Sequence, residues 1–256
     1  MKQNELKLYL DTLVSRYNST SFIVNDPISI PKQFVVKQDI EISAFWTAML
    51  AWGRRSTIIS KATQVITLMD RSPYQFIKNH QESDRKPFLQ FKHRTFQPED
   101  ALYFLHFFQK IFQLYDTLED AFLIEGENKG VEAGLTHFYN LFTQDEWLPQ
   151  HTRKHLSTPA KNSACKRLNM FFRWMVRRDD AKVDFGIWEK FSAKDLFIPL
   201  DVHVGKVSRS LGLLQRPSND WKAVLELTDN LRKMDRSDPV KYDYALFSLG
   251  VDGIMV

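Results

Sequence analysis

The stretch IPLDVHVGKVSRSLG, residues 198–212, places one carboxylate, Asp201, between an apolar run and a segment with helical periodicity. An Asp at this place supplies the short acceptor side chain that caps the first turn of a helix. A carboxylate can also do chemistry when other polar or charged groups accompany it. We therefore predict that Asp201 is a helix cap, and its neighbours decide whether it is also catalytic.

Basic side chains that could accompany such a carboxylate gather in three places. They lie in WGRR with Arg54 and Arg55, in residues 85–94, and in residues 166–178. The net charge of +4 and the pI near 9.0 are compatible with a polyanionic partner, although solvated helix faces produce similar runs. The clusters therefore indicate candidate phosphate contacts without identifying the partner.

Other chemistries find little support in the sequence. His203 lies in the first turn of the expected helix with no second histidine at ligand spacing, so we expect no metal site and no cofactor. Cys165 is the single cysteine, which excludes an internal disulfide and a thiolate cluster. The aromatic residues of LNMFFRWMV, 168–176, are read as core. Phosphate-binding glycine loops and serine-hydrolase elbows have no match.

The fold class follows from hydrophobic periodicity. The chain has 256 residues, 43% of them hydrophobic, and only 9 are glycines, while no run alternates convincingly over six residues. We therefore predict an all-α protein. The charged amphipathic start and the absence of a long uncharged apolar segment predict neither a signal peptide nor a membrane span, and a cytoplasmic location is the expectation.

Local signals divide the chain into helices. Asp39 and Gly53 are predicted to bound one core helix, Thr117 to open another with a capping box, and Pro98 to lie in the first turn of an almost wholly apolar one. Asp238, Pro239 and Gly250 predict the limits of the last helix, and residues 149–162 the longest loop. We place two lobes at 1–148 and 149–256, or one intertwined domain.

A family resemblance adds a function to these elements. The segment IPLDVHVGKVSRSLGLL resembles the one that follows the hairpin in the helix-hairpin-helix family of base-excision DNA glycosylases, with Asp201, His203 and Arg209 at matching positions. In that family the aspartate caps its helix and stabilises charge at the sugar of a flipped nucleotide. The resemblance covers about the last hundred residues and implies a two-lobed helical fold that binds double-stranded DNA in its cleft.

The nucleophile position departs from the family pattern. Matching LSTPAKNSA, residues 156–164, to the family's hairpin places Asn162 where a lysine stands, and both hairpin glycines are missing. Lys161 and Lys166 are then the candidate compensating lysines. The resemblance also makes Ser163, Lys161, Lys166, Arg167 and His203 candidate DNA contacts, and Arg54 and Arg55 join them because of their basic cluster.

Three functions stay open at this point. The first is a DNA glycosylase-like protein that excises a damaged or unusual base, with Asp201, Lys166 and Lys161 as catalytic candidates. The second is a binding module that keeps the contact with phosphate but not the chemistry. The third is a helical interaction protein without a nucleic acid role. Over nearly its whole length the chain also resembles a conserved, uncharacterised bacterial family, through DIEISAFWTAMLAWGRR and DPVKYDYALFSLG among other segments.

Overall fold

The computed structural model describes residues 3–21 and 23–251. Within these ranges the secondary structure is helical and no strand forms, because the β-type pairings are isolated bridges. The prediction of an all-α protein is confirmed. The chain divides into two compact units, Met1–Val24 with Thr158–Val256 and Asn25–Ser157.

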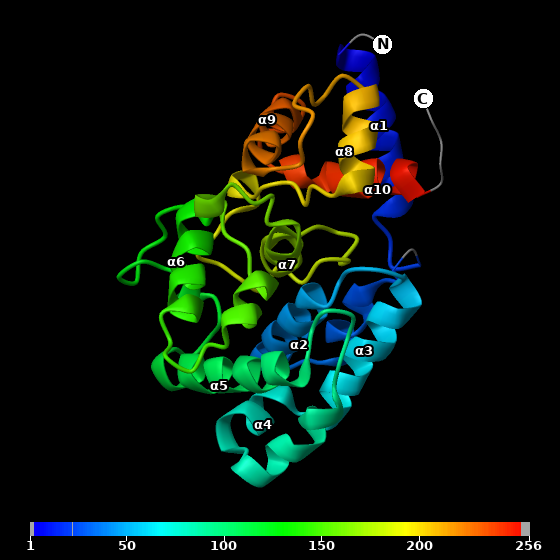
Figure 1. The fold of residues 1–256 in the computed structure, drawn as a ribbon. Helices are drawn as coiled ribbons and strands as arrows, with labels where there is room; N and C mark the ends of the chain where they lie inside the picture. Colours follow the sequence, from blue (N-terminus) through cyan, green and yellow to red (C-terminus); the bar gives the residue numbers. More distant parts are fainter. Residues whose placement is uncertain (1–2, 22, 252–256) are drawn as a thin grey trace. The chain divides into compact units, whose positions relative to one another are not determined.

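The unit Asn25–Ser157 is built on a helix with an almost wholly apolar surface. Its helices are α2 (Lys37–Met49), α3 (Arg55–Leu68), α4 (Pro73–Asn79), α5 (Pro98–Leu114) and α6 (Val131–Thr143), blue to green in Figure 1. Phe45 of α2 lies edge-on to Phe108 of α5 at 5.1 Å between ring centroids, and Phe107 to Phe142 of α6 at 5.0 Å. Aromatic packing of this kind adds to the burial energy, and α5 begins at Pro98 as predicted.

Two predicted helix starts in this unit are wrong. α2 begins at Lys37, and Asp39 lies inside its first turn, where its carboxylate accepts the backbone N–H of Tyr74 at 2.8 Å. The helix ends at Met49, before Gly53. Residue Thr117 opens no α-helix; only a 3-10 turn follows, at Asp120–Phe122.

The Thr117 hydroxyl instead meets a buried carboxylate. It donates to Glu41, which is fully buried in α2, and the backbone N–H of Leu118 donates to the same carboxylate at 3.0 Å. A buried carboxylate needs such donors because it has lost water. This long-range demand explains why the predicted capping box does not form.

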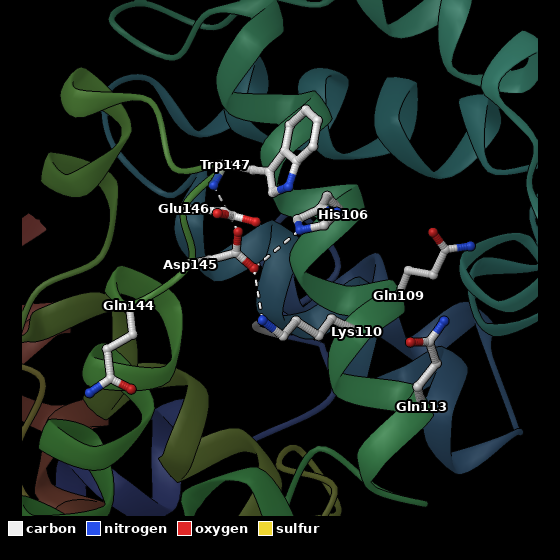
Figure 2. Close-up of a pocket in the computed structure, with 8 residues that line it drawn as sticks. All are labelled: His106, Gln109, Lys110, Gln113, Gln144, Asp145, Glu146 and Trp147. Carbon is white, nitrogen blue, oxygen red and sulfur yellow. Dashed lines mark hydrogen bonds and ion pairs between the residues drawn. The ribbon is translucent and has the colours of Figure 1, made fainter.

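A polar pocket of about 510 Å³ opens on the same unit (Figure 2). It lies between the polar stripe of α5 and the segment 144–147 that follows α6, and Trp147 stands at its edge with 72% of its surface exposed.

The second unit combines the N-terminal helix with the C-terminal segment. Its helices are α1 (Gln3–Tyr17), α7 (Lys166–Val176), α8 (Val202–Ser210), α9 (Trp221–Arg232) and α10 (Asp243–Val251). Both α1 and α8 pack on α10 (Figure 1). Their apolar faces bury Leu10, Val204 and Leu246 there.

The last helix differs from its predicted boundaries. A 3-10 helix, Pro239–Tyr242, precedes α10, and the Asp238 carboxylate does not cap it. Gly250 lies inside α10 instead of ending it, because the helix continues to Val251. A Cβ added at Gly250 would lie 2.8 Å from the Cβ of His203, so the glycine permits α10 to approach α8. Among the described residues, no helix has the length and apolar composition needed to cross a membrane.

Candidate functional site

Asp201 caps α8 as predicted, and it does so with one oxygen. Its Oδ1 accepts the backbone N–H groups of His203 and Val204, both at 2.9 Å. Its Oδ2 makes no hydrogen bond within residues 3–21 and 23–251. The cap therefore leaves one carboxylate oxygen for a ligand or a water molecule.

The backbone of Asp201 is held by the loop that precedes α9. The side-chain amide of Asn219 donates to the carbonyl of Asp201 at 3.1 Å. Arg209 of α8 donates in turn to Asn219 at 2.6 Å and to the carbonyl of Arg216 at 2.8 Å. Arg209 thus fixes this loop, and the loop fixes the start of α8.

A buried carboxyl, Asp243, links two of the three catalytic candidates, Asp201 and Lys166. Burial at the start of α10 raises the pKa of Asp243 to about 6, although Arg173 and Lys166 lower it; Asp201 and Asp184 raise it further. Asp243 also forms an ion pair with Arg173. The charges of Lys166 and Asp201 therefore act on the same buried group, and the structure brings the two predicted residues into one electrostatic neighbourhood.

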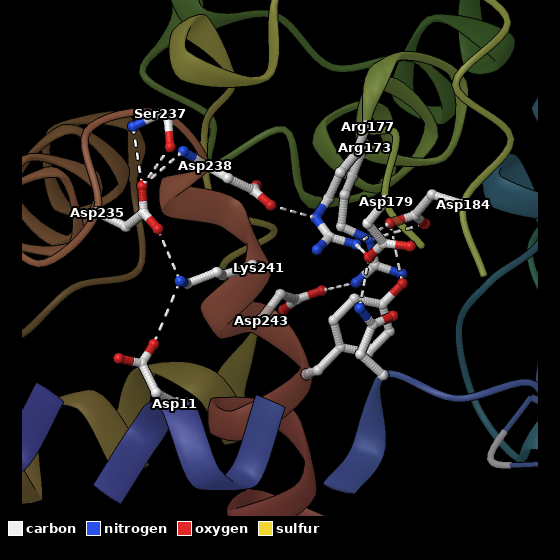
Figure 3. A network of polar contacts seen from close by, with 12 residues as sticks. Asp11, Arg173, Arg177, Asp179, Asp184, Asp235, Ser237, Asp238, Lys241 and Asp243 are labelled. Atoms are coloured by element: carbon white, nitrogen blue, oxygen red, sulfur yellow. Dashed lines mark hydrogen bonds and ion pairs between the residues drawn. The ribbon is translucent and has the colours of Figure 1, made fainter. Parts of the chain in front are cut away.

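Arg173 of α7 and Arg177, the residue that follows the helix, neutralise the carboxylates beside this group (Figure 3). Arg173 lies 3.3 Å from Asp184, and the Asp184 carboxylate also accepts the hydroxyl of Tyr244 at 2.9 Å. Arg177 pairs with Asp184 at 3.1 Å and with Asp238 at 2.9 Å. Burial alone would lower the pKa of Arg177, but the charges of Asp184 and Asp238 raise it above its usual value.

A second part of the same polar network ties α1 to the segment before α10. Lys241 lies 3.2 Å from Asp11 of α1 and 2.7 Å from Asp235 (Figure 3). Burial opposes ionisation of Asp235, yet hydrogen bonds from Lys241 and Ser237 hold its pKa well below the usual range. We infer that this part of the network stabilises the fold of the unit.

The position matched to the family's nucleophile is occupied by a structural residue. Asn162 adopts a left-handed conformation with φ 54° and ends the 3-10 helix Pro159–Lys161. Its side-chain amide donates to Asp220 at 3.2 Å, and its carbonyl accepts the N–H of Trp221 at 3.1 Å. Ser163 forms an isolated bridge with Asp220. Asn162 therefore joins the predicted hairpin to the start of α9.

The basic candidates of this segment differ in exposure. Lys161 is exposed, and Lys166, the first residue of α7, is half-buried with its Nζ 3.7 Å from the Met170 sulfur. Burial lowers the pKa of the Arg167 guanidinium to about 10, although the charge of Cys165 raises it. Lys161 and Lys166 are thus the better placed of the three for a contact with phosphate.

The remaining candidates lie apart from one another along the chain. His203 is exposed in the first turn of α8. Arg54 and Arg55 belong to the other unit, where Arg55 is the first residue of α3 and Arg54 directly precedes it. In the described part of the chain, no group of three or more His, Cys, Asp or Glu side chains has the arrangement of a metal site.

Sequence reasoning missed Asp243 and Arg173. Arg173 lies in SACKRLNMFFRWMVRR, whose pattern indicates a basic run. Asp243 lies in DPVKYDYALFSLG, whose pattern indicates a helix boundary. A charged residue on the apolar face of a helix is a signal for a buried pair, since it needs a partner there. Arg173, among Phe171, Phe172 and Trp174, carries this signal.

A known protein family matches most of the chain. The family described as "Protein of unknown function (DUF2400)" matches residues 26–252. The chain belongs to this family. The match includes Asp201, Asp243 and the hairpin-like segment, and it confirms the predicted membership of a conserved, uncharacterised family. No curated protein and no solved structure matches the chain.

Proposed function

We propose that this protein binds double-stranded DNA and excises a damaged or unusual base in the manner of a DNA glycosylase. The cap at Asp201 carries the proposal: one oxygen holds the start of α8, and Oδ2 is left for chemistry. The resemblance of residues 198–214 to the glycosylase segment gives the same two roles to the matching aspartate.

The proposed reaction is hydrolysis of the glycosidic bond of a flipped nucleotide. The bond between C1′ and the base nitrogen breaks, water adds its oxygen to C1′, and the base leaves with a proton. Asp201 Oδ2 stabilises the positive charge that develops at the sugar and accepts a proton from the water. Asn162 cannot form a Schiff base, so we expect base release without strand cleavage.

DNA contact is assigned to the start of α7 and the turn before it. The first N–H groups of a helix attract phosphate, and Lys161 and Lys166 add positive charge at this helix start. The Ser163 hydroxyl is a further candidate donor. Such contacts position the duplex without reading its sequence.

A non-catalytic DNA-binding module is the second candidate. It is favoured because Asn162, which stands where the family has its nucleophilic lysine, donates a hydrogen bond to Asp220. This bond keeps the backbone of the hairpin in place, but the asparagine cannot act as the nucleophile. This candidate keeps the phosphate contacts and predicts no base release.

Base release from a panel of lesion-bearing duplexes tests the proposal. We expect release by the wild type, loss in Asp201→Asn, and retention in Asp180→Asn, a matched change at an exposed carboxylate. Borohydride trapping should give no adduct. An adduct that disappears in Lys166→Ala or Lys161→Ala would identify that lysine as the nucleophile. Salt-dependent duplex binding without release would select the binding module, and absence of both would overturn a role with DNA.

A further inference from the structure

The turn between α2 and α3 packs against two other segments of the unit Asn25–Ser157. The indole of Trp52 in this turn lies 4.8 Å from the His93 ring and 6.1 Å from the His155 ring, measured between ring centroids. The Nζ of Lys61 in α3 lies 5.6 Å from the centroid of the Phe91 ring. Three segments therefore meet around Trp52, and they are residues 50–61, 91–97 and 150–155.

A glycine gives room to an arginine at this junction. Gly53 has a φ of 102°, and a Cβ added to it would collide with the Nη1 of Arg94. The guanidinium of Arg94 therefore lies against the backbone of the residue that precedes Arg54. Arg94 itself has a φ of 54°, in the left-handed region that glycine and asparagine occupy at a lower cost. An arginine held in this conformation indicates a use for its side chain.

The cations of the three segments have no carboxylate among them, because these segments contain neither Asp nor Glu. The side chains of Arg54, Lys92 and Arg94 are exposed, and within the residues that the structure describes they make no hydrogen bond or ion pair. Burial lowers the pKa of His93, and the positive charges of Lys61 and Arg94 lower it further. The cations are therefore close enough to act on one buried ring.

The carboxylates of neighbouring elements do not balance this charge. Asp100 of α5 is fully buried and binds His155 at 3.0 Å, whereas Glu99 is exposed and lies 3.4 Å from His151. The 3-10 helix Glu82–Gln90 packs on α3, and its two acidic residues are matched by two basic ones. The positive charge of the three segments therefore exceeds the negative charge around them.

We propose that Arg54, Lys92 and Arg94 form a contact surface for the phosphate backbone of a nucleic acid. Exposed cations without carboxylate partners attract a polyanion, and the planar guanidinium of arginine matches the geometry of a phosphate. A duplex and a single strand present the same phosphates. The inference rests on the nucleic acid role in the proposed function and adds a contact in a different unit from α7, but it does not require base release.

Fluorescence anisotropy over a salt series, with a duplex and with a single strand of the same sequence, tests this surface. Each cation that binds a phosphate adds about 1 to the slope of log K against log salt, so Arg54→Gln with Lys92→Gln and Arg94→Gln should reduce it by about 3. Arg54→Lys with Arg94→Lys keeps both charges and should keep the slope. A reduction for the duplex alone would assign the surface to double-stranded DNA, and a reduction for the single strand alone to unpaired strands.

A charge-matched triple variant is the control. Arg71→Gln with Lys78→Gln and Lys129→Gln removes the same charge from exposed positions elsewhere in the unit and should leave the slope unchanged. Equal reduction by the two triple variants would mean an effect of net charge and would overturn the proposal. It is also overturned if the triple variant of the surface keeps the wild-type slope, or if the wild type binds vesicles that contain phosphatidylserine but neither oligonucleotide.

Base release separates this inference from the proposed excision. A reduced slope in the triple variant of the surface, together with no release from any lesion, would support the surface and contradict excision. Release by the wild type, together with an unchanged slope in that variant, would contradict the surface alone.

Discussion

The side-chain amide of Asn162 donates a hydrogen bond to Asp220, the residue that caps α9. Asp220 also accepts from Arg216 at 2.7 Å, and hydrogen bonds from Arg216 together with the cap hold its pKa well below the usual range. The position that resembles a nucleophile site is thus tied into the junction between the hairpin-like turn and α9. Its residue type follows from backbone geometry and from this bond.

Substitutions of Asn162 should separate these two contributions. In Asn162→Gly the left-handed φ of 54° is kept without strain, whereas alanine meets a steric cost there of about 1–2 kcal/mol. We expect Asn162→Ala to lower the free energy of unfolding by about that amount more than Asn162→Gly does, measured by urea denaturation. Equal destabilisation of the two variants would mean that the side-chain bond, which both remove, decides the stability.

The cap at Asp201 predicts different outcomes for Asn and Ala. An amide oxygen still accepts the N–H groups of His203 and Val204, so Asp201→Asn should unfold within a few tenths of a kcal/mol of the wild type, whereas Asp201→Ala should be destabilised by about 1 kcal/mol. Chemical denaturation measures both. A base-release activity that survives in Asp201→Asn but falls in Asp201→Ala would assign this residue to structure alone.

The pKa of Asp243 gives a pH dependence with a defined sign. Its folded-state pKa of about 6 lies above the ordinary aspartate value of 3.8, so the protonated carboxyl stabilises the fold below pH 3.8, and this contribution disappears as the pH rises through about 6. The free energy of unfolding of the wild type minus that of Asp243→Asn should therefore fall across this window and level off above it. Asp180→Asn is the control, and a difference that stays constant from pH 3.8 to 6 contradicts the assignment.

How much the sequence could predict depends on the range of the interactions. The cap at Asp201 and the start of α5 at Pro98 are decided within one turn, and both were predictable. Asp39 and Asp238 have the same local signal, yet their carboxylates bind Tyr74 and Arg177, 35 and 61 residues away in the chain. The sequence does not distinguish an aspartate that caps its own helix from one whose carboxylate binds a donor far away in the chain.

The candidate site has the same division between local and distant information. The resemblance identified Asp201 as a candidate. The structure adds that the charges of Asp201 and Lys166 both act on the pKa of Asp243. The proximity of these charges depends on the packing of α8 on α10. The hydrophobic periodicity of a helix predicts which of its faces is buried, but it does not predict which other helix covers that face. Packing of α1 on α10 is hidden from the sequence for the same reason.

Arg177 is the residue of the buried network whose removal should cost the most. It is 2% exposed and pairs with Asp184, Asp238 and Asp179, so Arg177→Met leaves three carboxylates with less compensation. We expect the free energy of unfolding to fall by about 3–5 kcal/mol. Lys129→Met, which breaks an exposed pair with Glu127, should cost less than about 1 kcal/mol. Similar destabilisation by both substitutions would contradict a structural role for the buried network.

Phosphate binding at the start of α7 predicts a change in the salt dependence of DNA binding. Removing one lysine that binds a phosphate should reduce the slope of log K against log salt by about 1, so Lys161→Gln with Lys166→Gln should reduce it by about 2. The affinity should fall equally for unrelated duplex sequences, because phosphates do not encode sequence. Lys222→Gln with Lys233→Gln removes the same charge from exposed positions at α9 and is the matched control. Fluorescence anisotropy over a salt series measures the slopes. If both double variants reduce the slope equally, the effect is one of net charge; if neither does, the start of α7 does not bind the DNA.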